Sequence, residues 1–332
     1  MITKRNLGHW ALAATMAAAL LACGKKPEAA APAAAPAAAE VTIAYITNGN
    51  TNEGWTLING GAKTAGSAPG VKFIELAAEK GELSKQLAIV EDMITRKVSA
   101  IAIAPVDSKG IAPAVSKALA AGIPVVAVDT GISGAQITSY VATDNIKAAM
   151  VQGDWAADQL KDGDTVIYIT GDLGQSTGQE RKKGFLDGLN AKRKNMKVVE
   201  VPTTWDQTMA QNGVEAALRA NPGAKVIACA WDGGALGAKA ALMAAGKKAG
   251  EVKIAGFDGS PGGLDMMKQG WQQANAAQML AKIGQVGVET AIAAAQGKKV
   301  EARIDTGSFL VLPENVDQFA KDSGVAQFMK VK

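Results

Sequence analysis

The hydrophobic positions of residues 41–257 fall into eight short runs of five to seven residues, most of them rich in Val and Ile. Turns follow these runs, and between several of them lie longer, alanine-rich patterns with helical spacing, as at 83–97, 111–122 and 213–223. Nearly continuous apolar strands separated by helices are typical of parallel sheets that helices cover on both faces. The predicted strands are 41–46, 71–76, 100–106, 124–128, 165–170, 197–201, 225–230 and 252–257.

Eight such strands can close into a single barrel or form two open sheets, and two segments favour the second arrangement. Residues 138–160 carry a strand-like piece directly into a long helix near the middle of the chain, as expected where one sheet ends and another begins. Residues 272–297 supply one more strand and helix near the far end. The sequence therefore predicts an α/β fold of two Rossmann-like lobes, each a parallel sheet flanked by helices, with late segments that cross back.

The first 40 residues differ from the rest in composition. A basic start precedes an apolar stretch at 10–22, which is the layout of a secretory signal peptide and is shorter than the roughly 20 residues of a membrane span. The sequence LLAC, which ends at Cys23, resembles the lipobox of bacterial lipoproteins and implies cleavage before Cys23 and its acylation. Residues 23–40 form an alanine- and proline-rich spacer. An ordinary signal peptide with a chance cysteine is the alternative.

Charge and residue types exclude several classes of function. Without residues 1–22, which contain Lys4 and Arg5, the 35 basic residues fall to 33 against 31 acidic residues. This net charge of +2 gives no electrostatic reason to expect nucleic acid. The only histidine, His9, leaves with the signal peptide, so none remains as a base or metal ligand. Cys229 lies in an apolar run, which favours a buried, inert thiol; we expect no catalytic group, metal or cofactor.

The residues that follow each strand are the candidates for a ligand site, because open α/β sheets bind ligands beyond the carboxyl ends of their strands. These residues are 48–55, Asp107, Asp129, Asp172, Trp205, Asp206, Trp231, Asp232 and Asp258. Carboxylates accept hydrogen bonds from hydroxyls, guanidinium groups donate in a fork, and an indole covers the apolar C–H face of a sugar ring. The recurrence of carboxylates and indoles indicates a site for a sugar or polyol.

Each of these side chains has a structural alternative. For Trp55, Trp205 and Trp231 it is packing between helix and sheet, and for Asp129 it is stabilisation of a turn. Trp155 and Trp271 lie within a helix pattern and beside a turn, and for them we expect a place in the core. Asp258 competes with a role as a helix cap, but the Ser-Pro pair that follows it already supplies cap and first-turn signals. Asp258 is therefore free for a ligand. On its own chemistry Arg181, which follows a glutamate, remains open between a solvated charge and a ligand contact.

At these residues the chain resembles the periplasmic sugar-binding proteins of the ribose-binding type, the soluble receptors of ABC importers. The resemblance covers about residues 41–311 and rests on the order and spacing of NxxxNEGW, IPVVAVDT, SYVATDN, ERKKGF, AGFDG and AAQ. It implies a periplasmic binding protein type I fold with lobes 41–143 plus 279–307 and 144–278 plus 308–332. Hinge closure at three crossings, near 143–144, 278–279 and 307–308, is the implied motion.

Carried over position by position, the family's pocket falls on ten residues of this chain. The resemblance implies that Arg181 and Asp258 hold ring hydroxyls and that Trp55 and Trp205 stack on the ring. The full set is Asn48, Asn52, Trp55, Asp129, Thr130, Arg181, Trp205, Trp231, Asp258 and Gln278.

The chain departs from the ribose receptor inside this pocket. The ribose receptor has an arginine at the position of Thr130, an asparagine at that of Trp231, and a second phenylalanine near Gly54. The lost cation and the added indole disfavour ribose and favour a different aldose, an inositol or a sugar alcohol. We expect Trp231 to form a wall of the pocket, while Gly233 and Gly234 let the next helix begin close behind its indole.

The resemblance also implies partners and a location. An ABC permease would be the main partner and a chemoreceptor an additional or alternative one, with a monomer held by its lipid at a periplasmic or cell-surface membrane. Two other classes fit less well. A nucleotide-binding enzyme would need GxGxxG after the first strand or a Walker motif, and both are missing. A sugar-sensing transcription regulator would need a DNA-binding module where the export signal stands.

Overall fold

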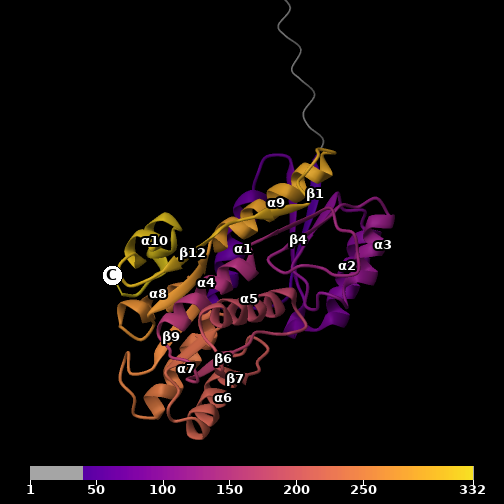
Figure 1. Cartoon of the computed structure of the whole chain (residues 1–332). Helices are drawn as coiled ribbons and strands as arrows, with labels where there is room; N and C mark the ends of the chain where they lie inside the picture. Colours follow the sequence, from indigo (N-terminus) through magenta and orange to yellow (C-terminus); the bar gives the residue numbers. More distant parts are fainter. Residues whose placement is uncertain (1–39, 332) are drawn as a thin grey trace, which may run out of the picture. The chain divides into compact units, whose positions relative to one another are not determined.

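The computed structural model describes residues 40–331. The predicted signal peptide (1–22), the acylation site at Cys23 and all but the last residue of the predicted spacer (23–40) lie outside this range. Two six-stranded sheets, each flanked by helices, make up the described part of the chain (Figure 1). Between residues 40 and 331, no helix has both the length and the apolar character needed to cross a bilayer.

The first sheet has the strand order β11-β5-β4-β3-β1-β2, and all its neighbouring strands are parallel. The strands are β1 (Val41–Thr47), β2 (Val71–Ala77), β3 (Ala100–Ile103), β4 (Val125–Val128), β5 (Ser139–Ala142) and β11 (Arg303–Asp305). The helices of this lobe are α1 (Glu53–Gly66), α2 (Leu83–Thr95), α3 (Ala112–Ala120) and α9 (Leu280–Ala295), with a 3-10 turn, η1 (Glu79–Gly81), after β2. Both β3 and β4 are buried throughout, as central strands covered on both faces should be. We call this unit the first lobe.

The second sheet has the order β12-β10-β9-β8-β6-β7 and is parallel except for β12, which runs antiparallel to β10. The strands are β6 (Thr165–Ile169), β7 (Lys197–Val201), β8 (Val226–Cys229), β9 (Lys253–Asp258), β10 (Ala274–Gln278) and β12 (Ser308–Val311). The helices of this second lobe are α4 (Asn145–Asp158), α5 (Ser176–Lys192), α6 (Gln207–Ala220), α7 (Asp232–Ala244), α8 (Pro261–Lys268) and α10 (Val316–Asp322), followed by a 3-10 turn, η2 (Val325–Phe328).

Two open sheets confirm the predicted fold class, and all eight predicted strands are present, as are the strand and helix expected in 138–160 and in 272–297. The sequence patterns missed β11 and β12, and the expectation of wholly parallel sheets is wrong for β12. β11 has three residues, two of them charged and exposed, so it lacks the apolar run that marks a buried strand. β12 does contain an apolar run, Phe309–Val311, but only Val311 of this strand is buried. Trp155 and Trp271 pack against the core of the second lobe, as predicted. Cys229 is buried, which raises its pKa.

The chain passes between the lobes three times, at 142–145, 278–280 and 305–308. The guanidinium of Arg303 donates to the carbonyl of Ala142 at 2.8 Å and to that of Thr143 at 2.9 Å. One carboxylate oxygen of Asp305 accepts from the backbone N–H of Asp144 at 3.1 Å and of Gly307 at 2.9 Å. The first and third links are therefore bonded to each other.

Two helices that follow crossings pack closely against a neighbouring helix: α9 against α1 in the first lobe, and α4 against α5 in the second. Both contacts depend on glycine. A Cβ on Gly61 of α1 would overlap the carbonyl oxygen of Ala281, and a Cβ on Gly284 of α9 would overlap that of Ile58. Glycines in α4 and α5 make the same kind of backbone approach. Close helix contact therefore anchors the chain just beyond two of the three links.

We expect Gly61→Ala to lower the free energy of unfolding by about 2 kcal/mol, because an added methyl group forces α1 and α9 apart. Gly60→Ala is the matched control, since Gly60 is exposed in the same helix and has open space around its position. This change should raise the stability by up to about 1 kcal/mol, because alanine is the better helix former. Urea denaturation measures both values, and equal effects of the two substitutions would contradict the close contact.

Candidate functional site

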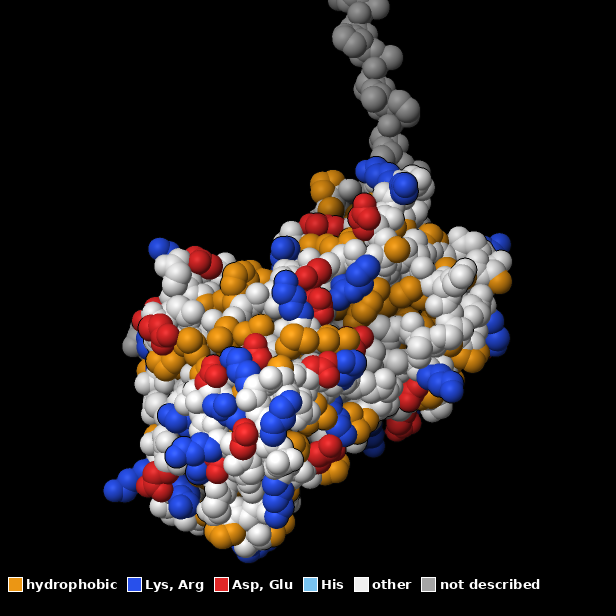
Figure 2. Space-filling model, in the orientation of Figure 1, with side chains coloured by type: hydrophobic (Ala, Val, Ile, Leu, Met, Phe, Trp, Pro, Cys, Tyr) orange, Lys and Arg blue, Asp and Glu red, His pale blue; other side chains and the backbone are white. Residues whose placement is uncertain are grey.

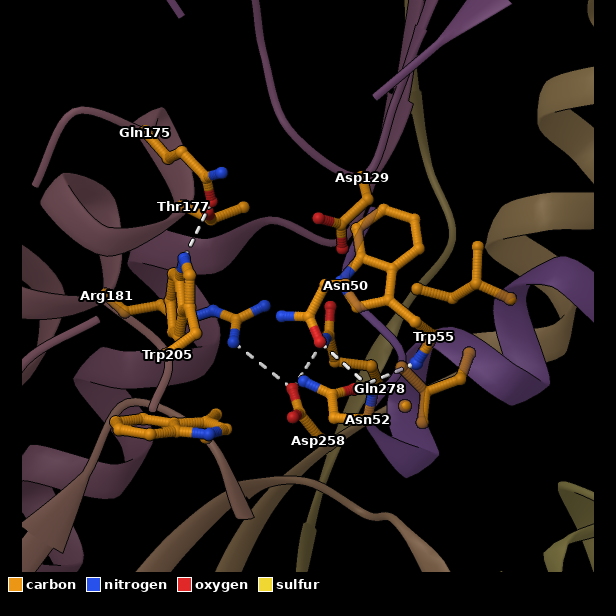
Figure 3. Close-up of a pocket in the computed structure, with 14 residues that line it drawn as sticks. Asn50, Asn52, Trp55, Asp129, Gln175, Thr177, Arg181, Trp205, Asp258 and Gln278 are labelled. Atoms are coloured by element: carbon orange, nitrogen blue, oxygen red, sulfur yellow. Dashed lines mark hydrogen bonds and ion pairs between the residues drawn. The ribbon is translucent and has the colours of Figure 1, made fainter. Parts of the chain in front are cut away.

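Side chains predicted from the strand ends meet in one cavity between the two lobes (Figure 3). Parallel strands present their carboxyl ends at one edge of each sheet, and β1, β4, β8, β9 and β10 lead into this cavity. The lining residues are Asn50, Asn52, Gly54, Trp55, Ile58, Asp129, Gln175, Thr177, Arg181, Trp205, Trp231, Asp258, Gln278 and Leu280. Eight of the ten predicted site residues are among them.

The other two predicted residues, Asn48 and Thr130, do not line this cavity. Asn48 is buried, and its side-chain oxygen accepts from the backbone N–H of Asn50 at 3.0 Å. Thr130 is fully buried, and its hydroxyl donates to the carboxylate of Asp129 at 2.8 Å. Both residues therefore support a neighbour that lines the cavity, which corrects their expected place in the lining.

The loop after β1 is built from alternating asparagines. The Oδ1 atoms of Asn48, Asn50 and Asn52 each accept a backbone N–H from further along the loop, all at 3.0 Å. The last of these bonds comes from Trp55 and caps α1, so the indole is fixed at the first turn of that helix. Because a side-chain amide has both an acceptor and donors, this use of Oδ1 leaves the Nδ2 groups of Asn50 and Asn52 as donors at the cavity wall.

Arg181 is buried in the second lobe, so the alternative of a solvated charge is wrong. Its Nε donates to Oδ1 of Asn145 at 2.9 Å, and its Nη1 donates to the carbonyl of Ala230 at 2.8 Å and to Oδ1 of Asp258 at 3.1 Å. The ring of Phe257 lies 4.0 Å from the guanidinium carbon. These contacts hold the cation in one orientation at the cavity.

Asp258 accepts a second hydrogen bond, from the side chain of Gln278 at 2.8 Å. Burial raises the pKa of Asp258 to about 6, although Arg181 and this amide both act to lower it. Capping of α8 is performed by Ser260, whose hydroxyl accepts from the N–H of Gly263 at 3.3 Å. The prediction that Asp258 is not needed as a cap is confirmed.

Backbone strain is concentrated at the cavity. Asp129, Trp205 and Asp258 have φ values of 64°, 62° and 105°, and they are three of the six non-glycine residues with positive φ in the part of the chain that the structure describes. Such conformations cost energy and cluster at functional sites. Burial also raises the pKa of the Asp129 carboxyl, and the charge of Arg181 partly offsets this effect.

Trp55 of the first lobe and Trp205 of the second line opposite sides of the cavity (Figure 3). Trp231, also of the second lobe, lines the cavity as well. The rings of Trp205 and Trp231 meet edge to face, with centroids 5.4 Å apart. A Cβ on Gly233 or Gly234 would collide with the indole of Trp231, so these glycines do allow α7 to begin close to it. The predicted wall and the reason for its glycines are confirmed.

Three polar lining residues, Asn50, Gln175 and Thr177, are not in the predicted set of ten, although Asn50 lies in the candidate range 48–55. A signal for Asn50 was present in the alternation of asparagines in NGNTN at 48–52. Gln175 and Thr177 follow β6 at the start of α5, beyond Asp172, which was the one residue chosen from that loop. The choice of Asp172 alone after β6 is therefore too narrow, because the first turn of α5 also reaches the cavity.

The remaining carboxylates at strand ends hold loops in place. Asp107 accepts from the N–H of Lys109 in its own loop at 2.9 Å, and Asp206 caps α6 by accepting from the N–H of Met209 at 2.6 Å. Asp232 is buried and accepts from Ser260 N at 2.8 Å and from the side chain of Asn275 at 2.6 Å, while burial raises its pKa. These groups shape the loops around the cavity and do not line it.

The lobes are bonded directly to each other around the cavity. The N–H of Ser108 donates to the carbonyl of Gly174 at 3.1 Å, and on another side the N–H of Gly262 donates to Glu53 Oε2 at 2.7 Å. The cavity between them has a free volume of about 30 Å³, which is the space of roughly one or two water molecules. A larger ligand therefore requires the lobes to part or the lining side chains to move. Reversible hydrogen bonding and stacking is the chemistry that this arrangement supports.

Comparisons with known proteins agree with this geometry. Residues 43–299 match the model of the periplasmic binding protein domain. The ribose import binding protein RbsB of Salmonella typhimurium is 32% identical over 278 residues, which cover 84% of this chain and 93% of that protein. The D-ribose/D-allose-binding protein of Pseudomonas aeruginosa is 34% identical over 274 residues, or 79% and 85% of the two chains.

A solved structure shows the same likeness in three dimensions. An ABC transporter solute-binding protein of Bacillus halodurans with bound myo-inositol superimposes with a TM-score of 0.80 at 26% identity, over 86% of this chain and 99% of that one. Sequence, fold and family model agree over most of the described residues. The chain belongs to the periplasmic binding protein family.

Proposed function

We propose that this protein is an extracytoplasmic solute-binding protein that holds a monosaccharide or a related polyol between its lobes and delivers it to an ABC importer. The observation that carries the proposal is the convergence of three indoles, two carboxylates and one guanidinium on a single cavity between two lobes. Relatives of this chain include binding proteins named for ribose and allose, and a solved neighbour contains myo-inositol.

Each group in the cavity has a role toward a hydroxylated ring. Asp129 and Asp258 accept hydrogen bonds from hydroxyls, Arg181 donates, and Trp55 and Trp205 cover the C–H faces. A hydrogen bond to a charged group contributes about 1.5–3 kcal/mol, and aromatic contact adds about 0.5–1.5 kcal/mol beyond its area. Several such contacts together offset the loss of freedom on binding.

We infer that the ligand is an aldose other than ribose, an inositol or a sugar alcohol. Arg181 is the single cation among the residues that line the cavity, because Thr130 has no charge and is turned toward Asp129. Trp231 adds an apolar wall instead of a polar side chain. The cavity therefore has fewer donors and more indole surface than a pocket with two arginines would have.

The predicted signal peptide and the cysteine at position 23 support a location outside the cytoplasm. Acylation of Cys23 would tether the folded lobes to a membrane through the spacer, with the protein acting as a monomer. Binding without turnover fits the described site, in which hydrogen bonds and stacking are the available interactions.

A thermal-shift screen tests the ligand class directly. We expect one or more aldoses, inositols or alditols to raise the melting temperature, because a ligand that binds only the folded protein stabilises it. Calorimetry on each hit then measures affinity and confirms that the compound is unchanged after binding. Stabilisation by amino acids or nucleosides, with none by polyhydroxylated compounds, would show that the proposed class is wrong.

Asp258→Asn should weaken the best ligand of that screen by about 10- to 100-fold, because a charged acceptor at the cavity is replaced by a neutral amide of the same shape. The variant should still fold, with one cooperative melting transition without ligand, because the amide oxygen of Asn can accept from Arg181 in place of the carboxylate. Asp317→Asn is the matched control, since Asp317 pairs with Lys268 on the surface. Loss of folding in the Asp258 variant would indicate a structural role instead.

Affinity should also fall on the acid side. With a pKa of about 6, Asp258 is ionised near neutral pH and only about one-tenth ionised at about pH 5, so the apparent Kd should rise about tenfold. Instability of the fold would not be the cause. A pKa raised from 3.8 stabilises the ligand-free fold at low pH, and this contribution is lost as pH rises through about 6. Calorimetry at several pH values measures this rise in the apparent Kd. If Asp258→Asn shows the same rise, another group is responsible for the pH dependence.

A further inference from the structure

A second polar cavity lies beside the first one. Its volume is about 480 Å³, and its lining residues are Asn48, Gly49, Asn50, Thr51, Lys80, Gly81, Val106, Asp172, Gln175, Thr204, Trp205 and Asp206. Asn50, Gln175 and Trp205 line both cavities. These three side chains therefore form the partition between a nearly filled space of about 30 Å³ and a much larger one.

Gln175 is the part of this partition that joins the two lobes. Its Oε1 accepts from the indole N–H of Trp205 at 2.8 Å in the second lobe (Figure 3). Its Nε2 donates to the carbonyl of Val106 at 3.0 Å, and more weakly to that of Pro105 at 3.4 Å, in the first lobe. Although Gln175 precedes α5 as its N-cap, its side chain makes no capping bond. The amide is thus committed to the contact between the lobes and to the indole.

The rest of the partition is held more locally. The Oδ1 atom of Asn50 accepts from the N–H of Asn52 at 3.0 Å, within the same loop. The strained backbone of Trp205, with φ at 62°, places its ring against Gly171, where a Cβ would overlap the indole. Truncation of Gln175 would therefore remove the one partition side chain that bonds across the lobes, while the backbone of the other two is fixed independently.

We propose that Gln175 determines the size of the ligand. It closes the first cavity toward the second one and so restricts the ligand to one unsubstituted ring. The inference rests on the proposed function, since it concerns the same site. A substituent on the ring hydroxyl nearest Gln175 meets an amide that three hydrogen bonds hold in place. With that amide removed, the substituent enters the second cavity.

The second cavity suits a neutral, hydrophilic substituent. Lys80, Asp172 and Asp206 give it charges of both signs, and Thr51 and Thr204 add hydroxyls. A second sugar unit satisfies these groups directly or through water, and an O-methyl group is small enough to leave their hydrating waters in place. An extended alkyl chain would leave them without partners. Gln175 therefore selects between free monosaccharides and their substituted derivatives.

Calorimetry with D-allose, D-ribose, D-fucose and myo-inositol, each paired with its mono-O-methyl derivatives, tests the proposal. For a parent compound that binds, we expect every derivative to bind the unaltered protein at least about 30-fold more weakly. The ratio of the Kd of a derivative to the Kd of its parent expresses this discrimination. Gln175→Ala should reduce the ratio at least about tenfold for one or more derivatives, namely those that direct the methyl group to the partition. The proposal is wrong if the unaltered protein accepts derivatives as well as the parent, or if Gln175→Ala changes no ratio.

Two further variants separate size from hydrogen bonding. Gln175→Met fills a similar space without the amide and should keep the discrimination against substituted rings. Gln179→Ala is the matched control, because Gln179 lies in α5 but is exposed, and its side chain donates to the carbonyl of Leu173 and not across the lobes. It should bind parent and derivatives as the unaltered protein does. If all four parents fail to bind while other polyols do, the same comparison is made with the polyol that binds.

If no polyol binds, the proposed function is wrong. The role of Gln175 in the partition can still be tested then, by a measurement that needs no ligand. Nuclear magnetic resonance reports the exchange of the Trp205 indole N–H with solvent. We expect this proton to exchange slowly in the unaltered protein and at least about tenfold faster in Gln175→Met, because its acceptor is lost. Equal exchange in both proteins would show that Gln175 does not hold the partition.

Discussion

The buried ion pair between Arg181 and Asp258 is the interaction on which the arrangement of the site depends. A buried charge without partners costs several kcal/mol, so the guanidinium must have its acceptors within the protein. Those acceptors come from the start of α4, the residue after β8 and the end of β9. By meeting this demand, the second lobe fixes the positions of three strand and helix ends, and with them the wall formed by Trp231. The left-handed backbone of Asp258 is maintained by the same contacts.

This network also reaches the links between the lobes. Asn145, which accepts from Arg181, is the first residue of α4 after the first link, and its amide also donates to the carbonyl of Thr143 at 3.3 Å within that link. Gln278, which donates to Asp258, is the last residue of β10 before the second link. A ligand that exchanges hydrogen bonds with Arg181 or Asp258 therefore acts on groups bonded to two of the three links. Outside the links, glycine-mediated helix contacts keep each lobe rigid.

How much of the fold and the site the sequence predicts depends on how far apart in the chain the interacting residues lie. Short Val- and Ile-rich runs identify the buried strands, and the residues after these runs locate most of the cavity, because both features are local in sequence. β11 escaped because its three largely accessible residues leave no pattern. β12 escaped although it contains the apolar residues Phe309–Val311, because the run is short and Phe309 is exposed. Thr130 was misplaced because its side chain turns to Asp129 and not to the cavity. Gln175 could not be found, because its role depends on Val106 in the other lobe.

Cys229 sits deep in the core of the second lobe, where burial raises its pKa and keeps it from reagents. The sequence contains only one other cysteine, at position 23. A version of the chain that begins after Cys23 would thus expose no native thiol. A single cysteine introduced at the rim of the cleft would accept a fluorescent dye alone, and the chain would become an optical reporter of its own ligand without loss of any residue from its core.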